Sequence, residues 1–187
     1  QLYLDGPADK VFTVLVPETI GTGLVVADDH VSGVDALAYL GGRSIGDIVA
    51  AEATWSNYVV ADARKCEKLP KVPELSNLMS VYGIAGKTAF HGLISVGQPI
   101  VGETVLVSAA AGSVGGYVGQ IAKALGCRVV GIAGGAEKCK WVKEEMGFDD
   151  CVDYRAPGLG KALRAACPDG VDVYFDNVGG TVLEAAL

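Results

Sequence analysis

Small residues concentrate between Ala109 and Gly116, where a short apolar run ends and a helical pattern of apolar residues begins. The dinucleotide fingerprint G-x-G-x-x-G occurs there as Ala110-x-Gly112-x-x-Gly115, with alanine in place of the first glycine. Gly112 lets the backbone approach a pyrophosphate closely, and Gly115 lets the helix pack closely on the strand. The free N–H groups and the positive dipole end of the helix attract phosphate charge. The stretch therefore predicts a nucleotide-binding turn, and the alternative is a purely structural strand-to-helix turn.

A second corner, formed by Ala133, Gly134 and Gly135, indicates which dinucleotide would bind. Sites that prefer NAD place an Asp or Glu about 20 residues beyond the glycines, where it binds the ribose hydroxyls. No acid stands at this corner, which leaves room for the 2′-phosphate of NADP, and Lys138 follows in the first turn of the next predicted helix. Its ammonium group could pair with that phosphate. The adjacent Glu137 is an acid and argues against a phosphate site, and the alternative for Lys138 is a solvated surface lysine. The corner favours NADPH over NADH.

The elements that must position these residues alternate between strand and helix along the second half of the chain. The predicted strands cover residues 105–107, 128–133, 150–154 and 171–176, and the predicted helices cover 114–125, 136–146, 159–166 and 181–187. This alternation predicts βαβ units and a partial doubly wound parallel sheet of the α/β (Rossmann) class. Because such a domain usually has about six strands, we expect the chain to be a fragment of a longer protein.

Residues 1–73 have a different pattern, in which short β-prone pieces alternate with Gly, Asp and Pro. The pieces are 11–16, 23–26, 48–50 and 55–60, and they predict an irregular, largely β region. Residues 75–96 are then predicted to form helical pieces broken at Gly83 and Gly86, with Thr88 beginning or capping the second piece. We interpret His91 as a packed or exposed helix residue rather than a catalyst, because no acid stands beside it.

The composition excludes several classes of function. A formal net charge of −7 argues against general binding of nucleic acid or of anionic membranes, and no apolar run is long enough to predict a transmembrane helix. The five cysteines form no CxxC motif or Cys/His cluster, which favours reduced thiols and a cytoplasmic setting. His30 and His91 are the only histidines, and neither has cysteine partners at ligand spacing, so we expect no metal site.

Six stretches together resemble one family. They are residues 86–93, 102–115, 130–138, 147–149, 153–154 and 174–180. In order and spacing they are similar to the zinc-free medium-chain dehydrogenases/reductases, and more narrowly to the NADP-dependent alkenal double-bond reductases, which include the prostaglandin reductases and leukotriene B4 dehydrogenases. The resemblance implies a partial GroES-like catalytic domain at residues 1–84 and a partial Rossmann NADP-binding domain at residues 85–187.

The resemblance also implies roles for individual residues. Those that match the family's cofactor-binding positions are Thr88, Gly112, Ser113, Val114, Gly115, Lys138, Tyr154 and Asn177. Lys138 and Tyr154 match the pair that holds the 2′-phosphate, Thr88 matches a threonine near the nicotinamide and pyrophosphate, and Asn177 matches an asparagine beside the cofactor. Tyr3 matches a tyrosine that lines the substrate pocket, although residues 5–43 depart widely from the family pattern. No residue of the chain is identified as the proton donor.

The predicted reaction is the NADPH-dependent reduction of the carbon–carbon double bond of an α,β-unsaturated ketone or aldehyde, with hydride delivered to the β-carbon and no metal. A quinone reductase of the same superfamily and a non-catalytic NADPH-binding protein are the alternatives, whereas a zinc alcohol dehydrogenase is not expected. The expected partner is a small enone or quinone, without nucleic acid or membrane, and a homodimer is one possible state.

Overall fold

The computed structural model describes residues 12–15, 24–27, 47–51, 58–61 and 66–187. The chain divides into two compact units, residues 1–79 and residues 80–187. The domain boundary expected at residues 84 and 85 lies slightly further along the chain and stays a prediction. Tyr3 and His30 lie outside the described residues, so the substrate-pocket role of Tyr3 also stays a prediction.

The first unit contains an antiparallel sheet with the strand order β4-β1-β2-β3-β5. Its elements are β1 (Phe12–Leu15), β2 (Leu24–Ala27), β3 (Ile48–Ala50), β4 (Tyr58–Ala61), β5 (Glu67–Lys68) and the short helix α2 (Ser76–Met79). Ile48 and Leu78 are buried together, with Leu69, Val72 and Leu75 packed against them. The four β-prone pieces of the sequence therefore correspond to strands, which confirms the prediction of a β-rich first region.

The second unit contains a four-stranded parallel sheet with the order β8-β7-β6-β9. Its elements are α3 (Ile84–Phe90), η2 (His91–Gly97), β6 (Thr104–Val107), α4 (Ser113–Ala124), β7 (Arg128–Ala133), α5 (Ala136–Glu144), β8 (Asp150–Asp153), α6 (Leu159–Ala166), β9 (Val173–Phe175) and α7 (Gly180–Ala186). Numbered along the chain, these strands follow the order 3-2-1-4 that begins a doubly wound dinucleotide-binding sheet. The predicted parallel α/β fold is confirmed.

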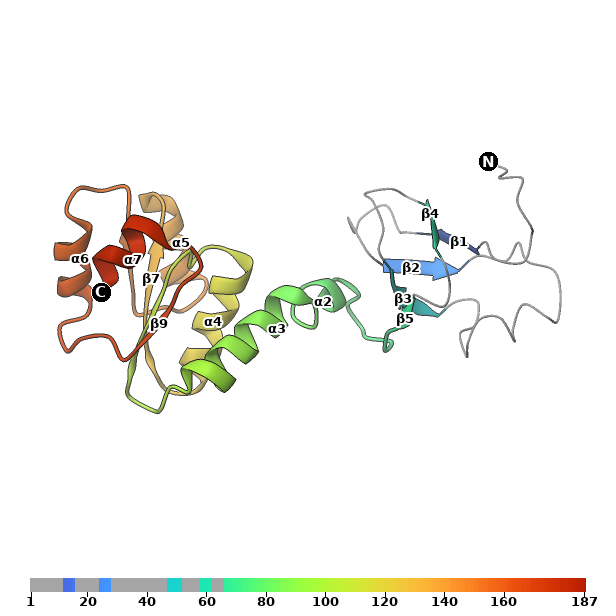
Figure 1. The fold of residues 1–187 in the computed structure, drawn as a ribbon, viewed down its shortest axis with the longest axis horizontal. Helices are drawn as coiled ribbons and strands as arrows, with labels where there is room; N and C mark the ends of the chain where they lie inside the picture. The colour runs from blue at the N-terminus through green and yellow to red at the C-terminus, as the bar shows by residue number, and fades with distance from the viewer. Residues whose placement is uncertain (1–11, 16–23, 28–46, 52–57, 62–65) are drawn as a thin grey trace. The chain divides into compact units, whose positions relative to one another are not determined.

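Helices cover both faces of this sheet because alternate residues of its strands point to opposite sides. Val105 and Val107 of β6 pack in one cluster with residues of α3, η2, α4 and α5, including Val118 and Val142. Leu106, between them, packs in a second cluster with residues of α6 and α7. Figure 1 shows α4 on one side of the strands and α6 and α7 on the other. The near-continuous apolar strands therefore reflect burial on both faces.

The helix α3 corrects two expectations from the sequence. It begins after Gly83 and runs through Gly86, so the predicted break at Gly86 is wrong. Thr88 lies within the helix and does not cap it. A Cβ at Gly86 would overlap the carbonyl group of Val81, so this glycine permits close approach of the preceding turn rather than ending the helix. The helix continues directly into the π-helical segment η2.

Candidate dinucleotide-binding site

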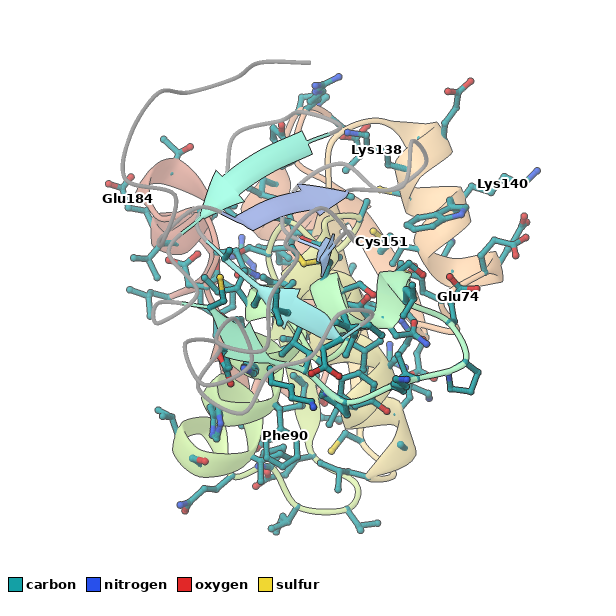
Figure 2. All side chains as sticks on the ribbon, turned by 90° about the vertical axis from the view of Figure 1, so that its right-hand side faces the viewer. Glu74, Phe90, Lys138, Lys140, Cys151 and Glu184 are labelled. Carbon is teal, nitrogen blue, oxygen red and sulfur yellow. The ribbon has the colours of Figure 1, made fainter. Side chains whose placement is uncertain are left out.

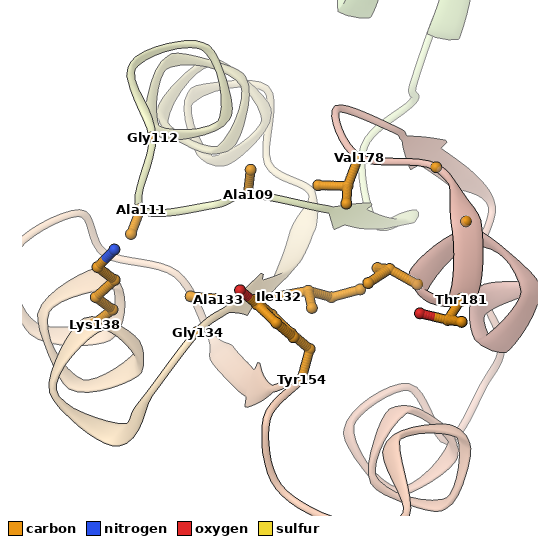
Figure 3. Close-up of a pocket in the computed structure, with 13 residues that line it drawn as sticks. Ala109, Ala111, Gly112, Ile132, Ala133, Gly134, Lys138, Tyr154, Val178 and Thr181 are labelled. Carbon is orange, nitrogen blue, oxygen red and sulfur yellow. The ribbon is translucent and has the colours of Figure 1, made fainter.

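A cavity of about 540 Å³ lies at the carboxyl ends of β6, β7 and β9. Its lining residues are Ala109, Ala111, Gly112, Ile132, Ala133, Gly134, Lys138, Tyr154, Val178, Gly179, Gly180, Thr181 and Val182 (Figure 3). No aspartate or glutamate is among these lining residues. In an open parallel sheet, ligands bind outside the carboxyl ends of the strands, where the strand order reverses. The cavity therefore has both the position and the charge that a phosphate-bearing ligand requires.

The glycine turn closes tightly between β6 and α4. Ala109 has a φ of +48°, a left-handed conformation that residues other than glycine rarely adopt. Its carbonyl oxygen accepts a hydrogen bond of 2.8 Å from the Gly112 N–H, and a Cβ at Gly115 would overlap that carbonyl group. Gly112 is the N-cap of α4, which begins at Ser113. Unusual backbone conformations of this kind cluster at ligand sites, and here the turn sets the first N–H groups of α4 at the edge of the cavity.

Lys138 and Tyr154 lie on opposite sides of the corner formed by Gly134 and Gly135. The exposed Lys138 is in the first turn of α5, and its ammonium group points toward Ala111 (Figure 3). Tyr154 is 45% exposed as a residue, and its ring packs on Gly134, where an added Cβ would lie 2.9 Å from the phenol oxygen. By contrast, Lys140 points away from α5 (Figure 2) and lies 3.8 Å from Glu144. The structure thus brings together the cation and the phenol that the sequence assigned to a 2′-phosphate.

Asp153, at the end of β8, is a residue that sequence reasoning missed. Its Oδ1 accepts hydrogen bonds from the backbone N–H groups of Gly135, at 2.8 Å, and Arg155, at 2.9 Å. These two bonds, the first of them more strongly, hold the pKa of Asp153 below its usual value. The side chain therefore ties the β7–α5 corner to the end of β8. The sequence signal for this contact was an acidic residue at the end of a predicted strand, since the neighbouring strand ends in a glycine corner with free N–H groups.

A second missed group lies between the ends of β6 and β9. Asp176 Oδ1 accepts hydrogen bonds from Ser108 Oγ at 3.0 Å and Tyr174 Oη at 2.9 Å. It also accepts the N–H groups of Val178 and Gly179, each at 3.0 Å. The bond from Gly179, followed by that from Val178, lowers the pKa of Asp176 to about 2. This carboxylate shapes the turn that leads from β9 to the cavity wall.

Asn177 is fixed by the same group. Its backbone N–H donates to Ser108 Oγ at 2.7 Å, and its side-chain Nδ2 donates to the Ser108 carbonyl oxygen at 2.9 Å. Because Ser108 is fully buried, these bonds hold the asparagine against the end of β6. Asn177 itself is not among the residues that line the cavity.

The residues assigned to cofactor binding from the sequence differ in their position relative to the cavity. Gly112, Lys138 and Tyr154 line the cavity directly. Ser113, Val114 and Gly115 form the first turn of α4, behind Gly112. Thr88 is an exposed residue of α3 and does not line the cavity. The cofactor contacts assigned to all of these residues stay predictions.

Comparison with known proteins agrees with this geometry. Residues 113–187 match the family model described as "Zinc-binding dehydrogenase", and that segment begins at the first residue of α4. This chain belongs to the medium-chain dehydrogenase/reductase superfamily. The family recognised from the six sequence stretches is therefore confirmed.

Three curated relatives are similar in sequence to this chain. An NADPH-dependent curcumin reductase from Escherichia coli (strain K12) is 47% identical over 145 residues, covering 76% of this chain and 41% of the relative. Prostaglandin reductase 1 from Bos taurus is 45% identical over 147 residues, covering 76% and 44%. A 2-alkenal reductase (NADP(+)-dependent) from Nicotiana tabacum is 43% identical over 145 residues, covering 76% and 42%. The chain thus spans less than half the length of each of these relatives.

A solved structure has the same fold with a nucleotide bound. CurA from Vibrio vulnificus in complex with NADPH matches with a TM-score of 0.75 and 31% identity, over 99% of this chain and 61% of that one.

Within the described part of this chain, no three His, Cys, Asp or Glu residues are grouped so that they could hold a metal ion. No helix among the described residues is long and apolar enough to cross a membrane.

Proposed function

We propose that this chain supplies the NADPH-binding part of a reductase that acts on the carbon–carbon double bond of α,β-unsaturated ketones and aldehydes. The observation that carries the proposal is a cavity with no Asp or Glu in its lining, in which the Lys138 ammonium group and the Tyr154 phenol flank Gly134. A ribose hydroxyl pair would find no carboxylate partner among these lining residues, whereas a 2′-phosphate would find a cation and an O–H donor. The relatives named as reductases of curcumin, prostaglandins and 2-alkenals support the reaction class.

We infer that the residues present also suit the pyrophosphate and the nicotinamide half of the dinucleotide. At Gly115 the turn leaves no room even for a methyl group, because a Cβ there would overlap the Ala109 carbonyl. The pyrophosphate is then expected at the N–H groups of Gly112 and the first turn of α4. Asn177 follows β9 and is held against Ser108, and Val178 beside it lines the cavity on the side away from Lys138 (Figure 3). We assign the nicotinamide half to this side.

When bound, NADPH supplies a hydride for the β-carbon of the enone, and negative charge develops on the carbonyl oxygen as an enolate. The residues of this chain bind and orient: the α4 turn holds the pyrophosphate charge, and Lys138 and Tyr154 fix the adenosine end. Stabilising the enolate requires a hydrogen-bond donor. We propose a reaction without metal, supported by the absence of Cys/His ligand spacing in the sequence.

The proposal is tested with the whole protein by following the oxidation of NADPH in the presence of simple enones and alkenals. We expect turnover with NADPH, and much slower turnover with NADH. A quinone tested as acceptor in the same assay separates the alternative of a quinone reductase. Binding of NADPH without turnover of any acceptor would favour a non-catalytic NADPH-binding protein, and failure to bind NADPH would contradict the proposal altogether.

We also infer a reducing, cytoplasmic setting. All five cysteines lie within the described residues, and none of them forms a disulfide there, as is usual in reducing compartments. The oligomeric state of the whole protein, monomer or homodimer, is measured by light scattering.

A further inference from the structure

The two groups assigned to the 2′-phosphate come from different segments of the chain. Lys138 stands on α5, which follows the corner at Gly134 and Gly135, whereas Tyr154 follows β8. Two mobile attachments would let the ammonium group and the phenol drift apart, and a phosphate needs both at once. Precise binding requires that such groups be held within about 0.5 Å of the productive geometry by supporting contacts.

The corner on the lysine side has little conformational restraint of its own. Gly134 and Gly135 are adjacent glycines, and Gly135 has a φ of +102° as the N-cap of α5. No side-chain hydrogen bond caps α5 at this residue. Because glycine populates many backbone conformations, a specific orientation of the first turn of α5 depends on a tie from outside the corner.

Asp153 provides that tie on the cavity side of the sheet. One oxygen, Oδ1, accepts the N–H of Gly135 at 2.8 Å and the N–H of Arg155 at 2.9 Å. The two donors lie directly beside the segments that carry Lys138 and Tyr154. The sheet adds a third bond at the same place, from the Tyr154 N–H to the Ala133 carbonyl at 3.1 Å. A single carboxylate oxygen thus couples the two halves of the 2′-phosphate site.

We propose that Asp153 is a positioning residue for selectivity between NADPH and NADH: it holds the Lys138 and Tyr154 segments in the relative placement that a 2′-phosphate requires. This inference rests on the proposed function, because it concerns the same nucleotide site. The role is geometric, since the negative charge of the carboxylate would by itself repel the 2′-phosphate. The two N–H donors offset that charge.

Three substitutions separate geometry from charge. Asp153→Asn keeps an oxygen acceptor at the same position and removes the charge, so the ratio of NADH to NADPH dissociation constants should stay at the wild-type value or rise. Asp153→Ala removes the acceptor, and Asp153→Glu keeps the charge but displaces it by one methylene. Each of these two should lower the ratio by about tenfold, the scale of one charge-assisted contact to a phosphate, through weaker NADPH binding with NADH binding nearly unchanged.

The matched control is Asp172→Ala. Asp172 Oδ2 accepts the Thr104 N–H at 2.8 Å, a similar carboxylate-to-backbone bond at the amino end of β6, away from the cavity. Its loss should change thermal stability and leave the dissociation-constant ratio unaltered. Both constants are measured by titration of nicotinamide fluorescence, with a melting curve for every variant.

The outcomes are distinct. A wild-type protein that binds neither nucleotide contradicts the proposed function, and the selectivity role with it. A wild-type protein that prefers NADPH, with the same preference in Asp153→Ala and Asp153→Glu, overturns the role of Asp153 alone. A loss of preference in Asp153→Asn equal to that in Asp153→Ala also overturns it. If Asp153→Ala does not fold, Asp153→Glu and Asp153→Asn still decide.

Discussion

Gly131 in β7 leaves the space that the Ala110 side chain fills. A Cβ placed on Gly131 would lie 2.8 Å from the Ala110 Cβ, and 3.2 Å from both Cys151 Sγ and Phe148 Cδ2. Ala110 occupies the first glycine position of the fingerprint and is fully buried. Its backbone does not adopt a positive φ, in contrast to Ala109. Alanine is therefore accommodated in the phosphate turn because the neighbouring strand carries a glycine opposite it.

Substitution Gly131→Ala should destabilise the second unit. The added methyl group has no room on three sides, and overpacking of a rigid interior costs about 1–3 kcal/mol. Urea unfolding curves of the wild type and the variant measure the difference in unfolding free energy.

The double variant Ala110→Gly, Gly131→Ala is the control for this contact. Removing the opposing methyl group should recover part of the loss, with a coupling energy of roughly 0.5–3 kcal/mol in a double-mutant cycle. Strictly additive effects would mean that the two residues do not share the space.

Substitution Lys138→Ala should weaken the binding of NADPH and leave the binding of NADH nearly unchanged. Loss of a charged contact to the 2′-phosphate corresponds to about 1.5–3 kcal/mol, or roughly 10- to 150-fold in the dissociation constant. Lys140→Ala is the matched control, because Lys140 is on the same helix with its side chain 70% exposed. Equal weakening of both nucleotides by Lys138→Ala would contradict the 2′-phosphate assignment.

Substitution Gly115→Ala should weaken both nucleotides together. The new Cβ would overlap the Ala109 carbonyl, so α4 must move away from the turn and its first N–H groups lose their placement. We expect a loss of at least about 1–3 kcal/mol in unfolding free energy. Gly160→Ala in α6 serves as the comparison, since its nearest heavy atom would be 3.6 Å away and a helical glycine is worth up to about 1 kcal/mol less than alanine.

Acid should weaken the turn that Asp176 organises. The carboxyl has an ordinary pKa of 3.8, which the native hydrogen bonds lower to about 2. A depressed folded-state pKa gives stability that is present above the unfolded pKa and is lost as the pH falls through the folded one. Between about pH 4 and pH 2, the stability advantage of the wild type over Asp176→Asn should therefore shrink, as measured by urea unfolding at each pH. Asp149 and Asp153, whose pKa values are also lowered, titrate in both proteins and cancel in the difference.

The sequence predicted the sheet of the second unit closely because its signals are local and repeated. Each strand is a short apolar run and each crossover helix has its own periodicity, so β7 and α6 were predicted with the bounds that the structure shows. The failures at Gly86 and Thr88 have a tertiary cause. A glycine in a helical pattern indicates a break only when no other part of the chain fills the space that a side chain would take. At Gly86 the Val81 carbonyl fills that space, so the helix continues.

Candidate site residues could be named from the sequence where residue type alone carries the chemistry. The glycines of the turn and the basic Lys138 could be identified from spacing. The role of Tyr154 at the 2′-phosphate followed only from the family resemblance, and its packing on Gly134 was not predicted. Asp153 was missed because its two partners are backbone N–H groups, for which an acid at the end of a strand is only a weak signal. Asp176 also has two such partners, and its side-chain partner Ser108 lies 68 residues away in the sequence. Ser108 and Asn177, which bond to each other, are 69 residues apart in the sequence, so local sequence patterns could not predict their contact.

The central strand β6 acquires its second neighbour late in synthesis. It pairs with β7 after one crossover, but its other edge pairs with β9, and the bond from the Thr104 N–H to Asp172 spans 68 residues. Until that length has left the ribosome, one edge of an apolar strand is uncovered, and contacts of such long range also slow folding. The strand that carries the phosphate turn therefore keeps one edge open to aggregation until β9 has been made.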